Sequence, residues 1–288
     1  MVTVDVEYAA EMRGLHGALV KAGFGDKMPF SRLVALNLLY ELTTACTSIV
    51  TQDGEGKMWH ARNLDWTFGS HSMANLTVSA SFQSQGKTEY KAITWVGYVG
   101  VLTGASDVFS VTIDQRTSHT VAEIVENLHR MKADHAQSVV LTARTALSES
   151  KTYLEAITTL SSTPLSAEVY YIVGGHETGQ GCVLTRSYTG LDYGLYCIPD
   201  GPQPWFVLET NYDVAGGIPA PAKDDRRKVA TAAMEGLGGP SGVNATSLFG
   251  VLQSPGTPFH TRGVLNSLTQ YSIVMSASTG FFQAWCWQ

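Results

Sequence analysis

The stretch that decides the fold is Thr43-Thr44-Ala45-Cys46-Thr47-Ser48-Ile49-Val50, where a long apolar helical pattern gives way to a strand pattern. Cleavage of the chain before Cys46 would place a thiol and an α-amine on one residue at the start of that strand. An α-amine titrates near pH ~8, far lower than a lysine, so it can accept the thiol proton directly or through one water without a histidine. The alternative is that Cys46 is a small buried apolar residue, the commoner fate of a lone cysteine.

Two helical patterns precede this stretch. Apolar residues recur at helical spacing over residues 11–20, and glycines then interrupt the pattern. A second helix is predicted from an N-cap at Ser31 through the almost fully apolar run 33–42. A helix that is apolar on all sides is buried or lies against a membrane or a partner. We therefore expect this segment to remain attached after a backbone cut before Cys46.

From Cys46 the period changes to that of short strands. A hairpin is predicted from strands at 46–51 and 57–62 with a turn at 53–56. The β-rich segments that follow, at 76–82, 93–101 and 108–113, are expected to form one antiparallel sheet. Further strands are expected at 169–173, 181–185, 193–198, 205–209, 269–275 and 280–285, and helices at 120–131, 136–147, 153–160, from about 224, and at 247–253.

Blocks of strands, then helices, then strands predict an α+β fold. The expected architecture is two antiparallel sheets with helices on their outer faces, a four-layer αββα sandwich. The Gly/Pro-rich stretches at 216–221 and 236–242 are too short to link two domains, so a single domain is predicted.

The composition excludes several classes of protein. A hydrophobic content of 44% and a charged content of 15% over 288 residues are typical of a globular chain. A net charge of -6 argues against a nucleic-acid partner, and the sequence has no apolar stretch long enough to cross a bilayer. Residues 1–7 lack the basic head and apolar core of a secretory signal. Two glycosylation sequons, at Asn75 and Asn244, favour a secretory route.

The cysteine and histidine spacing argues against a metal or cofactor. Cys46, Cys182, Cys197 and Cys286 form no CxxC pair, which excludes a zinc ribbon, while a single disulfide among the last three stays open. The sequence also lacks an HExxH zinc motif, a phosphate-binding loop and a Gly-x-Ser-x-Gly serine elbow. We therefore expect no metal and no cofactor.

The second strand of the predicted hairpin brings Arg62-Asn63-Leu64-Asp65 beside Cys46. An arginine next to a thiol lowers its pKa, and a carboxylate bonded to the α-amine orients it. The alternative is that Arg62 and Asp65 form a surface salt bridge.

Two more polar segments are candidates for the site, one just after a predicted strand and one at a predicted helix start. Asn211 lies just after the strand predicted at 205–209, where its amide suits donation to a developing oxyanion, although such a residue is more often part of a turn. The acidic and basic run at 224–227 would ordinarily be a solvated helix start.

Taken together, these segments match the motifs of one known family in their order and spacing over residues 11–271. The chain resembles the lysosomal N-acylethanolamine acid amidases and acid ceramidases, of the choloylglycine-hydrolase branch of N-terminal-nucleophile hydrolases. The matching motifs are Leu36-Asn37-Leu38, Ala45-Cys46-Thr47-Ser48-Ile49-Val50, Arg62-Asn63-Leu64-Asp65, Gly97-Tyr98-Val99-Gly100, Thr103-Gly104, Tyr171-Ile172-Val173-Gly174-Gly175, Thr210-Asn211-Tyr212-Asp213 and Asp224-Asp225-Arg226-Arg227.

The resemblance implies self-cleavage of the Ala45-Cys46 bond. It divides the chain into an N-terminal helical segment, 1–45, and a catalytic N-terminal-nucleophile domain, 46–288, which stay together as two subunits. It also implies a lysosomal location and a chain whose N-terminus is incomplete. The apolar helix would then help to form an acyl channel or a membrane-contact surface.

The resemblance also assigns roles to single residues. It implies that Cys46 is the nucleophile, that Arg62 and Asp65 position the thiol and its amine, that Asn211 donates to the oxyanion, and that Arg226 supports the site. One departure is Gln115 in Asp114-Gln115-Arg116, where the family carries an acid. An amide there can hydrogen-bond but cannot carry charge.

The substrate implied is a lipid amide. The segments 147–150 and 169–175 resemble the acylethanolamine amidases more than the ceramidases, so hydrolysis of fatty-acid N-acylethanolamines is expected, with ceramide as the alternative. A third possibility is a lipid-binding homologue that has lost activity, against which the intact set of five site residues argues.

Overall fold

The predicted hairpin that starts near Cys46 is present, and the residues of its turn, 53–56, explain why the chain reverses direction. The computed structural model describes residues 6–37, 44–66, 70–116, 121–201, 203–214, 216–220, 224–256 and 262–287. Strands β1 (Thr44–Gln52) and β2 (Met58–Trp66) pair antiparallel along their full length. In the turn, Asp53 Oδ1 accepts from the N–H groups of Glu55 and Lys57, and Gly56 takes a φ of +80° that favours glycine.

Strand β1 begins two residues earlier than the sequence predicts. Its register pairs Ala45 with Asp65 and Cys46 with Leu64. The Ala45–Cys46 peptide therefore lies inside a paired strand rather than at a strand end.

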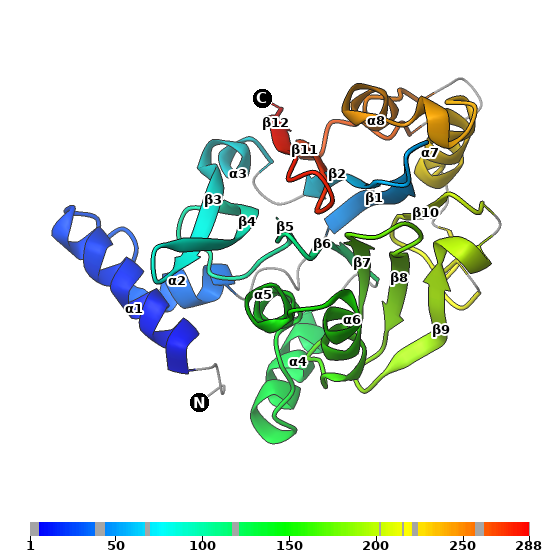
Figure 1. The fold of residues 1–288 in the computed structure, drawn as a ribbon. Helices are drawn as coiled ribbons and strands as arrows, with labels where there is room; N and C mark the ends of the chain where they lie inside the picture. Colours follow the sequence, from blue (N-terminus) through cyan, green and yellow to red (C-terminus); the bar gives the residue numbers. More distant parts are fainter. Residues whose placement is uncertain are drawn as a thin grey trace.

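The hairpin is the centre of a five-stranded antiparallel sheet with the order β10-β1-β2-β11-β12. Its other strands are β10 (Phe206–Glu209), β11 (Thr269–Met275) and β12 (Phe282–Cys286). Helices α7 (Arg226–Glu235) and α8 (Ala245–Leu252) cover its outer face (Figure 1). The side chains of Leu248 and Val251 pack with Ile49 and Val274 of the sheet. Asn244 and Ser247 form a capping box that starts α8.

The second sheet has seven antiparallel strands. In order they are β3 (Thr77–Ser84), β4 (Lys87–Trp95), β5 (Thr103–Ala105), β6 (Phe109–Gln115), β7 (Val169–Gly175), β8 (Gly181–Arg186) and β9 (Leu191–Cys197). The three β-rich segments expected to share one sheet do so, while the first hairpin belongs to the other sheet. The strand predicted at 93–101 ends at Trp95, because Gly97 adopts a φ of +88° and the Tyr98 N–H turns back to the Trp95 carbonyl.

A disulfide joins neighbouring strands of this sheet. Cys182 of β8 and Cys197 of β9 are register partners and are bonded. Cys286 is a free, exposed thiol and Cys46 a free, buried one. The single bridge that the sequence left open is therefore between Cys182 and Cys197.

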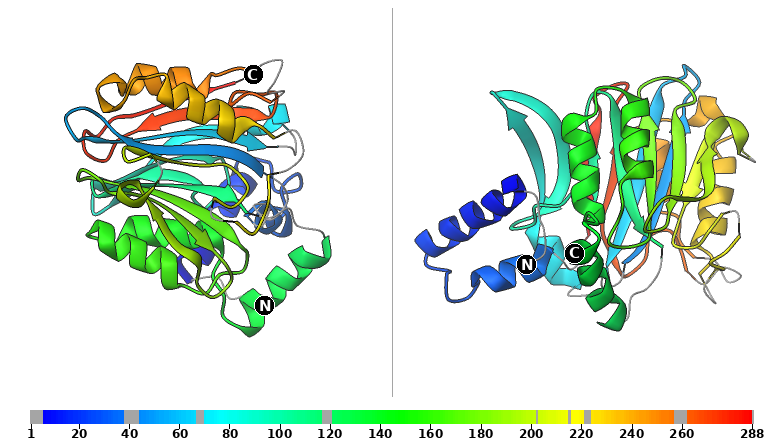
Figure 2. Two further views of the ribbon diagram at one scale, coloured as in Figure 1. Left: turned by 90° about the vertical axis from the view of Figure 1, so that its right-hand side faces the viewer. Right: turned by 90° about the horizontal axis from the view of Figure 1, so that it is seen from below.

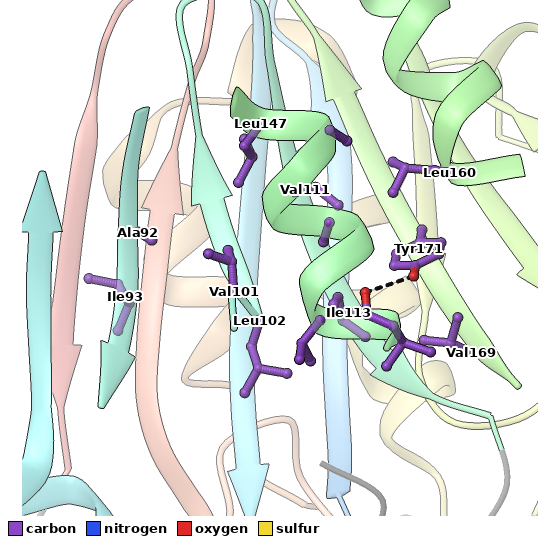
Figure 3. Packing of buried hydrophobic residues seen from close by; sticks show 14 of the residues in the cluster. Ala92, Ile93, Val101, Leu102, Val111, Ile113, Leu147, Leu160, Val169 and Tyr171 are labelled. Atoms are coloured by element: carbon purple, nitrogen blue, oxygen red, sulfur yellow. Dashed lines mark hydrogen bonds between the residues drawn. The ribbon is translucent and has the colours of Figure 1, made fainter. Parts of the chain in front are cut away.

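Helices α5 (Val139–Glu149) and α6 (Tyr153–Ser162) cover the outer face of the second sheet, and α4 (Val121–Ala133) precedes them. Figure 3 shows α5 lying over buried side chains, among them Val111 and Ile113 of β6 and Val101 of the loop before β5. Tyr171 reaches up from β7 and donates its hydroxyl to the Val139 carbonyl, 2.8 Å away. Figure 2 shows the resulting helix, sheet, sheet, helix layers, which confirm the predicted fold class.

The N-terminal helices project from the side of the sandwich (Figure 2). They are α1 (Val6–Lys21) and α2 (Phe30–Asn37), and a helix that the sequence did not predict, α3 (Ser70–Leu76), leads into β3. Ser31 is not the N-cap, because the Pro29 carbonyl already accepts from the N–H groups of Arg32 and Leu33 and the helix starts before it. Residues 38–42 of the predicted apolar run lie outside the described part of the chain.

Polar contacts attach this N-terminal segment to the sandwich. The Asn37 side chain donates to the Gly97 carbonyl at 2.9 Å and accepts from the Val99 N–H at 2.6 Å. Arg144 of α5 bridges the two parts, donating to Glu11 at 2.6 Å and to the Val99 carbonyl at 2.6 Å. Among the described residues, no helix is both long enough and apolar enough to span a bilayer.

Candidate active site

Residues from four segments meet around Cys46, which lies near the start of β1. β1 lies between β10 and β2, so the chain just after β10 and the end of β2 both reach Cys46. Arg62 and Asp65 come from β2, Asn211 follows β10, and Arg226 is the first residue of α7. The structure thus brings all five of the sequence-predicted side chains into one neighbourhood.

Cys46 is held at three of its atoms by three different side chains. Arg62 Nη2 donates to Cys46 Sγ at 3.0 Å. The Cys46 amide N–H donates to Asn211 Oδ1 at 2.7 Å, and the Cys46 carbonyl accepts from Arg226 Nη1 at 2.5 Å. The nucleophile candidate is therefore fixed in position and orientation, with no exposed surface in the uncleaved chain.

Arg62 is fully buried and is held mainly by neutral acceptors. Its Nη1 donates to the Leu102 carbonyl at 2.6 Å and to Thr103 Oγ1 at 2.5 Å, and its Nη2 donates to the Ile113 carbonyl at 2.7 Å. Thr103 is in β5, Ile113 is in β6 and Leu102 directly precedes β5, so Arg62 joins the two sheets. Neutral acceptors leave its positive charge available to nearby acids.

The sequence predicted that Arg62 would favour the thiolate, and burial outweighs this effect. Removal from water raises the pKa of the Cys46 thiol to about 11, and Arg62 offsets only part of that rise. Asp114 and Asp65 raise it further. Arg62 thus acts on the thiol in the expected direction, and in the uncleaved chain the effect of burial on the thiol pKa is the larger one.

The orientation of the Asn211 amide follows from its partners. Its Oδ1 accepts from both the Cys46 N–H and Arg226 Nη2, at 2.7 and 2.9 Å, so this atom must be the oxygen. Its Nδ2 donates to the backbone carbonyl of Gln115 at 2.8 Å. In this state the residue faces the amine position of Cys46 with its acceptor, and one amide hydrogen is used by Gln115.

Arg226 and Asp65 form the outer part of the site. Asp224 holds the guanidinium of Arg226 through both carboxylate oxygens, at 2.9 and 2.6 Å. Asp65 Oδ2 lies 3.7 Å from Arg226 Nη1 and accepts from Asn266 at 2.7 Å, while its Oδ1 accepts from Thr269 at 2.7 Å. Burial raises the pKa of Asp65, and Arg226 counters this effect. In the uncleaved chain Asp65 therefore acts on Cys46 through Arg226, which contacts both residues.

Sequence reasoning did not find Asn266 and Thr269, and it treated Asp224 as a helix start. Asn266 belongs to no motif, and its role depends on a loop that folds back onto β2. Thr269 was only weakly indicated, because it is the first residue of a strand that the sequence predicted. Asp224 sits two residues before Arg226, and that spacing alone suits a carboxylate that caps a buried guanidinium.

Comparison with known proteins identifies the family of the chain. The family model described as linear amide C–N hydrolases, choloylglycine hydrolase family, matches residues 46–195, starting at Cys46 itself. The chain belongs to this family. It is therefore a hydrolase of linear amide C–N bonds.

Relatives and solved structures narrow the comparison. The chain is 35% identical to the N-acylethanolamine-hydrolyzing acid amidase of Cavia porcellus over 94% of this chain and 71% of the relative. It is 32% identical to the acid ceramidase of Mus musculus over 96% of this chain and 69% of the relative.

The structure of a Caenorhabditis elegans N-acylethanolamine-hydrolyzing acid amidase ortholog superposes with a TM-score of 0.70 at 30% identity, covering 84% of this chain and all of the other. A conjugated bile acid hydrolase from Clostridium perfringens, at 11% identity and a TM-score of 0.50, shares the fold.

Proposed function

We propose that this protein is a cysteine amidase that hydrolyses fatty-acid N-acylethanolamines to fatty acid and ethanolamine, after self-cleavage before Cys46. The observation that carries the proposal is the triple hold on Cys46, in which Arg62, Asn211 and Arg226 each contact a different atom of the residue that would become the new N-terminus. Such a hold orients a thiol and an amine that belong to the same residue.

Self-cleavage starts with attack of Cys46 Sγ on the Ala45 carbonyl carbon. The thiol loses its proton, the C–N bond of the Ala45–Cys46 peptide breaks, and the nitrogen takes up a proton to become the α-amine. Water then hydrolyses the thioester and releases Ala45 as a carboxylate. No metal or cofactor enters either step, since the peptide carbonyl and the thiol supply the electrophile and the nucleophile.

The amidase reaction repeats the same chemistry on a substrate. The Cys46 thiolate attacks the acyl carbonyl, and the Asn211 amide with a backbone N–H stabilises the oxyanion. The protonated α-amine gives its proton to the departing ethanolamine nitrogen, and water hydrolyses the acyl thioester. Asn211 Oδ1, which already accepts from the Cys46 nitrogen, would keep the amine next to the thiol.

The two fragments are proposed to stay together as a heterodimer. Asn37, Glu11 and Arg144 supply contacts that do not depend on the Ala45–Cys46 bond. Exposed apolar side chains at Val20, Phe24 and Phe30 lie where α1 turns into α2, and they support peripheral contact with a lipid surface from which the substrate is taken.

A lysosomal location is part of the proposal. The Cys182–Cys197 disulfide is typical of proteins that fold in an oxidising compartment. Both sequon asparagines are exposed, Asn75 in α3 and Asn244 at the start of α8, and the capping bond of Asn244 uses Oδ1 rather than the Nδ2 that would carry a glycan.

The test is self-cleavage and turnover of the full chain. Incubated at about pH 4.5, the purified precursor should yield two bands on a denaturing gel and then hydrolyse palmitoylethanolamide faster than ceramide, the substrate class of the ceramidase alternative. Cys46→Ala should abolish both activities, whereas Cys286→Ser, at the exposed free thiol, should retain them. A precursor that stays whole and hydrolyses neither lipid would instead support an inactive lipid-binding homologue.

A further inference from the structure

Two acidic groups lie next to the Arg62 guanidinium. Cys46 Sγ accepts from Nη2 at 3.0 Å, and Asp114 Oδ1 lies 3.8 Å from the same nitrogen. All three side chains are fully buried. Because Arg62 carries one positive charge, the thiolate and the carboxylate compete for it in a medium where charge is poorly screened.

Asp114 is poorly stabilised as an anion. Its Oδ1 accepts from Ser48 at 2.8 Å, but its buried Oδ2 has no hydrogen-bond partner among the described residues. Ser48 in turn accepts from Thr112, which bonds His60, so the neighbours on that side are neutral hydroxyls and an imidazole. Burial raises the pKa of Asp114 to about 7 and lowers the pKa of His60 to about 3.

The charged groups that face Asp114 come from each packed element. Arg62 and Asp65 are on β2, Arg226 is on α7, and Glu209 is on β10. Arg62 and Arg226 favour the ionised form of Asp114, whereas Asp65 opposes it. Arg226 is already paired with Asp224 at 2.6 Å, so Arg62 is the cation nearest to Asp114 with its charge uncommitted to a contact ion pair.

Ionised Asp114 therefore disfavours ionised Cys46, and the reverse. With Asp114 charged, the thiol faces a guanidinium whose charge is partly offset, 3.8 Å from the carboxylate, and a second negative charge close by. With Asp114 protonated, Arg62 can stabilise the thiolate alone. The two groups titrate as a coupled pair rather than independently.

We infer that Asp114 is a positioning residue for the amidase, which acts through Arg62 and makes the Cys46 nucleophile competent only while Asp114 carries a proton. The inference rests on the proposed self-cleavage, which gives the thiol its first reaction. It assigns to Asp114 an inhibitory effect at neutral pH and none in acid. Asn at this position is a permanent analogue of the protonated acid.

The experiment compares self-cleavage rates of the wild-type precursor and Asp114→Asn on gels across about pH 4.5 to 8.5. The ratio of variant to wild-type rate should be near one below about pH 5.5 and should rise by up to about tenfold per pH unit above pH 7. Taking the ratio removes pH effects from other groups. Asp107→Asn, an exposed acid just before β6, should keep a ratio of one throughout.

Each other outcome has a defined meaning. A ratio that is constant over pH would show a purely structural role, and an Asp114→Asn chain inactive at every pH would show that the ionised carboxylate is required; either result overturns the inference. If Asp114→Asn does not fold, Ser48→Ala replaces it. Loss of that hydroxyl should move the onset of inhibition to higher pH, because Ser48 stabilises the ionised form, and an unchanged onset would overturn the inference. A wild-type chain that cleaves at no pH overturns the proposed function first.

Discussion

At the scale of single residues, the site is a series of side chains linked by hydrogen bonds and ion pairs that ends at Cys46. Asp65 and Asp224 both face Arg226, Arg226 holds the Cys46 carbonyl and Asn211, and Asn211 holds the Cys46 nitrogen. Arg226 and Asn211 fix Cys46 directly, and Asp65 and Asp224 act on it through Arg226, so the loss of a residue far from the thiol still affects the position of Cys46. Precise placement of this kind contributes more to rate than to affinity.

Asn211→Ala should lower lipid amide turnover by about a hundredfold or more, because it removes both the acceptor for the Cys46 nitrogen and the amide donor. Thr269→Val should cost less, about tenfold, since Thr269 contacts Asp65 and the Asn266 N–H rather than Cys46 itself. The measurement is kcat and KM for each purified, processed variant, with thermal unfolding as a check on the fold. Equal losses for the two variants would contradict the order of contacts described above.

The sequence could predict the members of the site that carry a motif, and it missed those placed by tertiary structure. Arg62 sits opposite Ser48 on the neighbouring strand, so a correct hairpin register is enough to bring it near Cys46. Asn266 approaches Asp65 across a separation of 201 residues, for which no local pattern exists. The rise of the thiol pKa also escaped prediction, because burial is a property of the packed molecule.

At the scale of elements, local turn chemistry was predictable and sheet membership was not. The Asp53 to Gly56 turn dictates a hairpin from its own residues. No local sequence pattern indicates that β2 pairs with β11 rather than with β3, the next strand in the sequence. The short β5 and helix α3 were missed since each has fewer residues than a periodic pattern needs.

The N-terminal helices provide the prediction at this scale. Asn37→Ala combined with Glu11→Gln should weaken the docking of residues 6–37 by about 1–3 kcal/mol, because the Gly97 carbonyl and the Val99 N–H lose their partly buried partner and Arg144 loses Glu11. After self-cleavage, the small fragment should then elute separately in size-exclusion chromatography. Arg13→Ala, at an exposed position of α1, is the matched control and should co-elute. Co-elution of both variants would show that the apolar contacts of α1 and α2 suffice.

At the scale of the whole molecule, buried titratable groups set how stability depends on pH. Burial raises the pKa of Glu209 to about 8 although Arg227 lies 2.5 Å away, and it raises the pKa of Asp114 to about 7. These acids hold protons in the folded chain that the unfolded chain releases above about pH 4.5. Their contribution to stability is complete in acid and is lost as the pH rises through 7 and 8.

His60 acts in the opposite direction at lower pH. Its pKa of about 3 means that the folded chain excludes a proton that the unfolded chain binds below about pH 6.5. Between about pH 4.5 and 6.5, the two acids outweigh the one histidine, so stability should be greatest near the acid end of this window.

The midpoint of thermal unfolding of the uncleavable Cys46→Ala chain should therefore fall by on the order of 10 °C between about pH 5 and pH 8. Glu209→Gln should remove a large part of this fall, because the amide retains an acceptor for Arg227 and leaves no proton to lose. Glu235→Gln, at an exposed acid of α7, should leave the pH dependence as it is. A midpoint that is constant from pH 5 to 8 would mean that Glu209 and Asp114 are ionised in the folded chain, and that their burial is compensated by Arg227 and Arg62.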